Sequence, residues 1–126
     1  MAIFIVQLGS PRRRNEGLRL GTVRRPPRGV PKADWRNYFD LWFPNLSPSA
    51  ELLRQGLGAQ GDRGRAAFRR KFLKEMSAPD RTRELALLAE LSHRTNLSVG
   101  CYCRDEDHCH RSLLRKLLVD LKADVV

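Results

Sequence analysis

Five residues whose side chains can act as nucleophiles, bases or metal ligands lie within ten positions near the end of the chain. They are Cys101, Cys103, His108, Cys109 and His110. All three cysteines of the sequence belong to this cluster. Three is an odd number, and the apolar stretch at residues 2–6 is shorter than we expect of a secretory leader. We therefore interpret the cysteines as thiols or ligands rather than as a disulfide framework.

Three chemistries fit the cluster. A zinc site would use Cys101, Cys103, Cys109 and one of the two histidines, His108 or His110, although the paired Cys-x-x-Cys spacing is missing. A nucleophilic or redox thiol, Cys109 or Cys103, would be activated by the neighbouring histidines. Cys101 would otherwise be a small buried hydrophobic residue on a core strand, which is the interpretation that we favour for it.

The elements around the cluster predict where these side chains stand. Residues 97–103 have the pattern of a strand, which places Cys101 and Cys103 on one face because side chains alternate. A leucine-rich helix begins near Cys109. Open α/β sheets often bind ligands where a strand ends and a helix begins. Unpaired backbone amides at that position attract anions, and the helix dipole favours a thiolate.

Arg111 lies in the first turn of this helix, where a cation opposes the helix dipole by about 0.3–1 kcal/mol. Such a cation needs a partner. The acidic residues at 105–107 could supply one, and a bound anion held by Arg111 and the helix amides could supply another. The sequence leaves both partners open.

Charge is concentrated in the first part of the chain. The whole sequence has a formal net charge of +10, from 24 basic and 14 acidic residues. Residues 1–36 contain nine of the basic and only two of the acidic residues. Most of the cations are arginines, whose planar fork suits phosphate and carboxylate groups. A GC-rich genome would also produce an arginine bias, so the clustering carries more information than the composition.

The remaining pattern predicts a single α/β domain over residues 1–126. Strands are expected at 2–6, 18–23 and 97–103, and helices at 65–76, 79–93 and from 109 onward, with a glycine-rich loop at 56–64. Aromatic residues at helical spacing predict a further helix over 35–43, packed in the core or at an interface. This order favours a small three-layer α/β fold, with a largely parallel sheet flanked by helices. No apolar run approaches the roughly 20 residues of a membrane span.

Several segments together resemble a known family. Cys101-Tyr102-Cys103, an acidic loop and Cys109-His110-Arg111-Ser112 before a leucine-rich helix resemble a bacterial family of domains of unknown function, number 488, in its YeaO-like branch. Segments 23–29, 45–52 and 68–72 are also similar to that branch. Two positions depart from it, because Val23 replaces an aspartate and Pro26 replaces a tryptophan. The resemblance implies a compact α/β fold and no particular activity.

The same resemblance implies, by position, that Arg24 and Arg28 lie near the cysteines. Our leading hypothesis is a small cytoplasmic α/β protein with an anion-accepting site, and with no membrane partner. Cys109 is its preferred reactive thiol or ligand, with His110 as base or ligand and Cys103 as a second thiol. The anion would be held by three arginines, Arg111, Arg24 and Arg28.

If the protein is an enzyme, acyl, phosphoryl or thiol chemistry on a small anionic substrate is the natural reaction class. Two alternatives belong to other classes. One is a nucleic-acid-binding accessory protein that uses the arginine-rich N-terminal region, whose binding would weaken steeply with salt. The other is a structural zinc or interaction module built on the cysteines.

Overall fold

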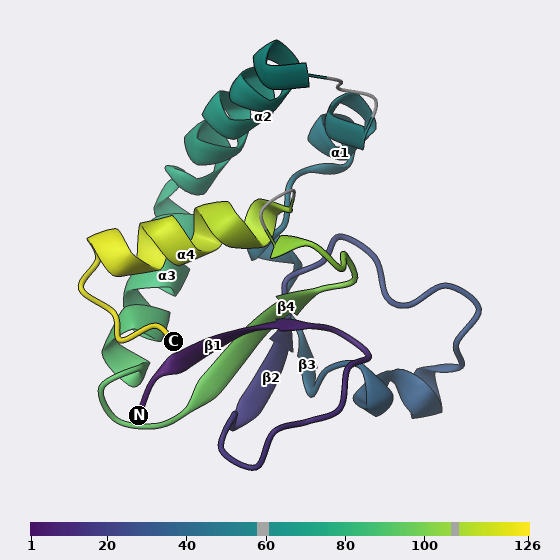
Figure 1. The fold of residues 1–126 in the computed structure, drawn as a ribbon, viewed down its shortest axis with the longest axis vertical. Coiled ribbons are helices and arrows are strands. Elements are labelled where there is room, and N and C mark those ends of the chain that lie inside the picture. The colour runs from purple at the N-terminus through teal and green to yellow at the C-terminus, as the bar shows by residue number, and fades with distance from the viewer. Residues whose placement is uncertain (58–60, 107–108) are drawn as a thin grey trace.

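Four short strands form one all-parallel sheet in the order β1-β4-β2-β3 (Figure 1). The computed structural model describes residues 1–57, 61–106 and 109–126. The strands are β1 (Ile3–Gln7), β2 (Leu18–Gly21), β3 (Leu41–Trp42) and β4 (Leu97–Cys101). The predicted α/β class, a small three-layer fold with a parallel sheet flanked by helices, is confirmed.

The central strand β4 determines where the cysteines lie. All five of its residues are buried, as expected for a parallel strand that is covered on both faces. It pairs with β1, where Gln7 is opposite Cys101, and with β2, where Gly21 is opposite Gly100. The carboxyl ends of three neighbouring strands therefore meet at the point where the cysteine segment begins.

Within the described residues, four α-helices accompany the sheet: α1 (Ala50–Leu57), α2 (Gly61–Met76), α3 (Pro79–Leu91) and α4 (His110–Asp120). Leucines and aromatic residues of these helices pack on the sheet in one core cluster, which includes Phe72, Leu88 and Leu114. A second cluster contains Val6, Phe39, Cys101 and Cys109. It lies on the opposite face of β1, because Phe4 and Val6 of this cluster alternate with Ile3 and Ile5 of the first. Burying each large apolar side chain contributes about 1.5–3 kcal/mol.

The helix predictions hold with changed boundaries. Helices predicted at 65–76, at 79–93 and from 109 onward correspond to α2, α3 and α4. The predicted loop 56–64 is wrong at both ends, because α1 continues to Leu57 and α2 begins at Gly61. Residues 58–60 lie outside the described part of the chain. In that described part, no helix has the length and apolar character that crossing a bilayer requires.

The predicted aromatic helix over 35–43 is wrong. The chain there forms a 3-10 helix, η1 (Lys32–Asn37), and then the short edge strand β3. Pairing with β2 extends the backbone, since Asp40 N–H donates to the Arg19 carbonyl and Phe43 N–H donates to the Gly21 carbonyl. The Asp40 carboxylate also accepts the Arg19 N–H, at 2.8 Å. These strand contacts outweigh the helical spacing of the aromatic residues.

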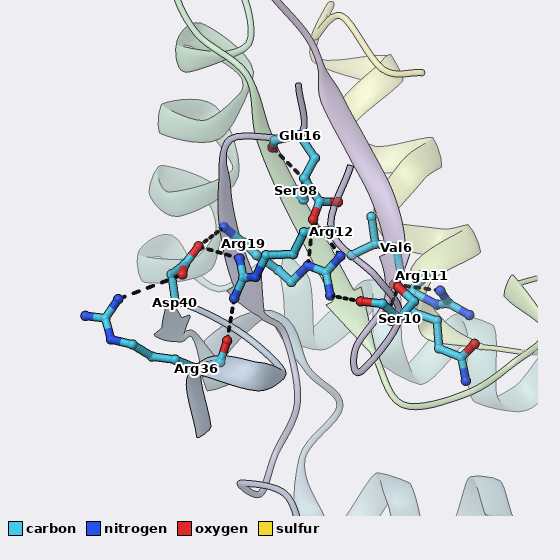
Figure 2. Close-up of polar contacts among 10 residues, drawn as sticks. Val6, Ser10, Arg12, Glu16, Arg19, Arg36, Asp40, Ser98 and Arg111 are labelled. Atoms are coloured by element: carbon cyan, nitrogen blue, oxygen red, sulfur yellow. Dashed lines mark hydrogen bonds and ion pairs between the residues drawn. The ribbon is translucent and has the colours of Figure 1, made fainter. Parts of the chain in front are cut away.

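A buried ion pair fixes the segment that leads into β2 (Figure 2). Arg19 and Glu16 are 0% and 1% exposed, and Arg19 Nη2 lies 2.6 Å from Glu16 Oε1. Arg19 Nη1 also donates to the Ser10 carbonyl at 3.1 Å. The Ser98 hydroxyl donates to the Glu16 carbonyl, which joins this segment to the central strand. The guanidinium thereby joins β2 to the loop that follows β1, and the Glu16 carbonyl joins the same loop to β4.

Arg19→Met should destabilise the protein by about 3–5 kcal/mol, because it leaves the Glu16 carboxylate buried without its cation. Arg65→Met is the matched control, since Arg65 and Asp62 form an exposed pair at the same i,i+3 spacing. That control should change the free energy of unfolding by no more than about 0.5 kcal/mol. Urea unfolding measures both. Equal losses for the two variants would contradict a structural role for the buried pair.

Candidate functional site

The three cysteines form one compact cluster of sulfur atoms, all within 4.8 Å of one another. Cys101 ends β4, Cys103 follows in the loop, and Cys109 is the N-cap residue of α4. The sulfur atoms of Cys101 and Cys103 are 3.8 Å apart. Cys101 and Cys109 are buried and Cys103 is exposed, and all three are free cysteines. The strand ends two residues earlier than predicted, yet the sulfur atoms still meet.

Arg111 holds the cysteine segment against the sheet. Its guanidinium is buried, with Nη1 2.7 Å from the Val6 carbonyl and Nη2 2.6 Å from the Cys103 carbonyl; Figure 2 shows the Val6 contact. Glu106, one of the acidic residues considered as its partner, instead pairs with Arg115. The two Nη groups of Arg111 therefore bind backbone oxygens, and a direct contact with an anion stays a prediction.

The ring of His110 is buried and oriented by the backbone. Its Nε2 lies 2.7 Å from the Thr22 carbonyl oxygen, which can only accept a hydrogen bond. Nε2 must therefore carry the hydrogen, and in the neutral ring Nδ1 keeps the lone pair. Nδ1 lies 3.6 Å from Cys109 Sγ, within hydrogen-bonding range for sulfur. The ring edge is packed against Phe72, with the two centroids 5.8 Å apart. His110 is thus placed to accept the thiol proton.

The surroundings of Cys109 favour its thiolate. Hydrogen bonds from the Cys101 and Cys103 thiols are the largest causes that lower the pKa of Cys109 far below its ordinary value. His110 lowers this pKa further, while burial opposes the shift. The pKa values of Cys101 and Cys103 are raised in return. The N-terminal end of α4 also favours a negative charge at its N-cap. Of the three cysteines, Cys109 is therefore the one whose surroundings favour the thiolate.

The three sulfur atoms could also hold a metal ion such as zinc. Among the described residues, no fourth histidine or carboxylate ligand lies within reach of all three sulfurs. His108, which the sequence offered as a ligand, lies outside the described residues. Cys101, Cys103 and Cys109 would thus supply three of the four ligands of a tetrahedral site.

A cavity of about 820 Å³ opens above the cysteine cluster. Arg24 and Arg28 line it together with Cys103, Cys109 and His110, so the structure brings these predicted residues together. Arg111 is not among the lining residues. The Nε and Nη2 atoms of Arg24 donate to the backbone carbonyls of residues 48 and 47. Burial is the main cause that lowers the pKa of Arg24.

Four further arginines line the cavity that were not singled out from the sequence: Arg25, Arg54, Arg65 and Arg69. They come from the loop after β2, from α1 and from α2. Of the described lining residues, none is acidic. The spacing of Arg65, Phe68 and Arg69 on one helical stripe was the available signal, but it does not tell which helix face meets the cysteines.

The rate of Cys109 alkylation by iodoacetamide should be nearly constant from about pH 6 to pH 9. The thiolate is the reactive form, and a lowered pKa keeps it fully populated as the pH falls below the ordinary thiol value of about 8.5. Cys103, whose pKa is raised, should react about tenfold faster for each pH unit over the same range. Mass spectrometry after timed quenching gives both rates from one sample. A tenfold rise per pH unit at Cys109 would refute the thiolate.

Comparison with known proteins identifies the family. The chain matches the model of DUF488-N3a, described as the active DUF488-N3 subclade, over residues 3–122. Searches of the curated proteins and of the solved structures gave no significant match. The resemblance to domain-of-unknown-function family 488 is thus confirmed, and the YeaO-like branch within it stays a prediction. The chain belongs to the DUF488 family, within the subclade that the N3a model describes.

Proposed function

We propose that the arginine-lined cavity is the active site of a thiol-dependent enzyme that acts on a small anionic substrate. Cys109 is the nucleophile and His110 is its base. The observation that carries the proposal is the contact of Cys109 Sγ with His110 Nδ1, in a ring whose Nε2–H is committed to the Thr22 carbonyl. A nucleophile, a base and an orienting acceptor are the parts that covalent catalysis requires.

The proposed reaction is a group transfer through a Cys109 adduct. The Cys109 proton resides on His110 Nδ1, and the thiolate sulfur attacks the acyl carbon or phosphorus atom of the substrate. A bond from sulfur to that atom forms, and the bond to the leaving group breaks with its electron pair. The imidazolium returns its proton to the leaving group. Water activated by the same ring then releases the acyl or phosphoryl group and restores the Cys109 thiolate and the imidazolium.

The cavity arginines support an anionic substrate. Arg25, Arg28, Arg54 and Arg69 have no carboxylate partner in the described residues, whereas Arg65 pairs with Asp62. Unpaired guanidiniums around a recess attract anions and raise the encounter rate by about 10–10³-fold. Arg111 serves here as a positioning residue, because it holds the loop that carries Cys103.

Cys101 and Cys103 support the same reaction as hydrogen-bond donors to the Cys109 thiolate. Removing either donor would raise the pKa of Cys109, because each lowers that pKa. The description of the matched subclade as active agrees with a chemically competent centre. A zinc ion bound by the same three sulfurs would make Cys109 a ligand instead, and elemental analysis of protein purified without metal-affinity resin distinguishes the two roles.

Two alkylating reagents with the same reactive group, one anionic and one neutral, test the anion site. The ratio of Cys109 rates with iodoacetate and with iodoacetamide should be about tenfold higher in the folded protein than in the urea-unfolded chain. Arg28→Ala should lower this ratio severalfold. Arg63→Ala is the control, because Arg63 is an exposed residue of α2 that does not line the cavity. Equal ratios in folded and unfolded protein would overturn the anion-accepting role.

Acetyl phosphate tests the nucleophile, because it is small, anionic and both an acyl and a phosphoryl donor. We expect an acetyl or phosphoryl adduct on Cys109, separable by mass, and none in Cys109→Ser. His110→Gln should slow adduct formation by about 10²-fold or more. His93→Gln is the matched control, since His93 is an exposed residue bonded to Asp124. Modification spread evenly over the three cysteines would contradict the assignment.

A further inference from the structure

The lining of the cavity combines buried reactive groups with exposed cations. Cys109 and His110 are 9% and 6% exposed. Arg54 and Arg69, on α1 and α2, are exposed residues of the same lining. A ligand that contacts both these arginines and the Cys109 sulfur would carry an anionic group apart from the atom that reaches the sulfur.

The rest of the lining is largely apolar and partly aromatic. Tyr38, Tyr102 and Phe68 contribute rings, and prolines, leucines, a valine and an alanine are the other apolar lining residues. Tyr102 is fixed, because its hydroxyl donates to the Arg25 carbonyl at 3.0 Å and its ring meets Tyr38 edge to face. Phe68 is fixed by stacking on Phe72, with an interplanar angle of 8°. Rigid, partly accessible rings of this kind offer faces to a planar ligand.

The size of the cavity agrees with a ligand larger than a simple anion. Cavities of about 300–1,000 Å³ hold ligands of drug or cofactor size, and this one measures about 820 Å³. Guanidinium groups bind phosphate in preference to single-point anions because their fork is bidentate. Aromatic rings beside phosphate-binding cations are the combination that recognises a base joined to a phosphate.

We infer that the cavity binds a nucleoside phosphate, with its phosphate at Arg54 and Arg69 and its base against Phe68 and Tyr102. This inference rests on the proposed function for the role of Cys109, because it places the base and sugar between the cations and the thiol. It specifies the anionic substrate as one that carries a planar ring.

Four probes separate the parts of such a ligand: adenosine monophosphate, ribose 5-phosphate, adenosine and inorganic phosphate. Isothermal titration gives their affinities, and protection of Cys109 from iodoacetamide shows whether they occupy the cavity. Adenosine monophosphate should bind at least about fivefold more tightly than ribose 5-phosphate, the least that base stacking contributes. Its affinity should fall as salt is added, because the phosphate contact is electrostatic.

Variants assign the two contacts. Phe68→Leu keeps an apolar side chain and should weaken the binding of adenosine monophosphate while leaving the affinity for ribose 5-phosphate unchanged. Arg69→Ala should weaken the binding of both ligands. Arg70→Ala is the control, because Arg70 is the next residue of α2 and does not line the cavity. Thermal unfolding verifies that each variant is folded, and Tyr102→Leu tests the same ring contact from another element should Phe68→Leu fail to fold.

The outcomes distinguish this inference from the proposed function. Equal affinity for adenosine monophosphate and ribose 5-phosphate, or equal protection by inorganic phosphate, would overturn the nucleoside phosphate and leave the anion-accepting thiol intact. Absence of any binding, with the iodoacetate preference still present, would do the same. Tight binding of adenosine monophosphate together with an unreactive Cys109 would support the binding site and overturn the enzyme.

Discussion

The site depends on one buried guanidinium. Arg111 joins the carboxyl end of β1 to the cysteine segment through the Val6 and Cys103 carbonyls. Arg111 is only 3% exposed, so its guanidinium cannot exchange these carbonyl contacts for water without leaving its buried position. Hydrogen bonds from a charged donor contribute about 1.5–3 kcal/mol each, so this side chain can hold a short loop in one conformation. That restraint keeps Cys103 next to the two cysteines that β4 and α4 hold.

The sequence predicted the parts of the fold that depend on local patterns. Buried strands β1 and β4 and helices α2, α3 and α4 follow from apolar spacing and from breakers such as Pro79. The aromatic segment at 35–43 was predicted wrongly, because its conformation is decided by pairing with β2 rather than by its own spacing. The spacing of the aromatic residues alone does not distinguish a helix from a short edge strand. The contacts that decide between them come from Arg19, which is distant in the sequence.

The part of the candidate site that lies in locally recognisable segments was also predictable from the sequence. The cysteines, His110 and the arginines after β2 lie in or beside recognisable segments, and the structure gathers them around one cavity. Arg54 and Arg69 were not predicted, since their place depends on how α1 and α2 pack against each other and above the sheet (Figure 1). The role of Arg111 was also unexpected. Its guanidinium, a group suited to binding anions, here donates its Nη hydrogen bonds to backbone carbonyl oxygens.

The acceptor that orients His110 belongs to the main chain of β2's extension and not to a side chain. Every amino acid at position 22 would offer the same carbonyl oxygen, provided that the strand keeps its course. In a Ser-His-Asp arrangement one point mutation removes the orienting group. Here no single substitution of that partner can do so. The tautomer of the histidine is therefore robust to evolutionary drift at its partner, and only changes that displace the strand itself can alter it.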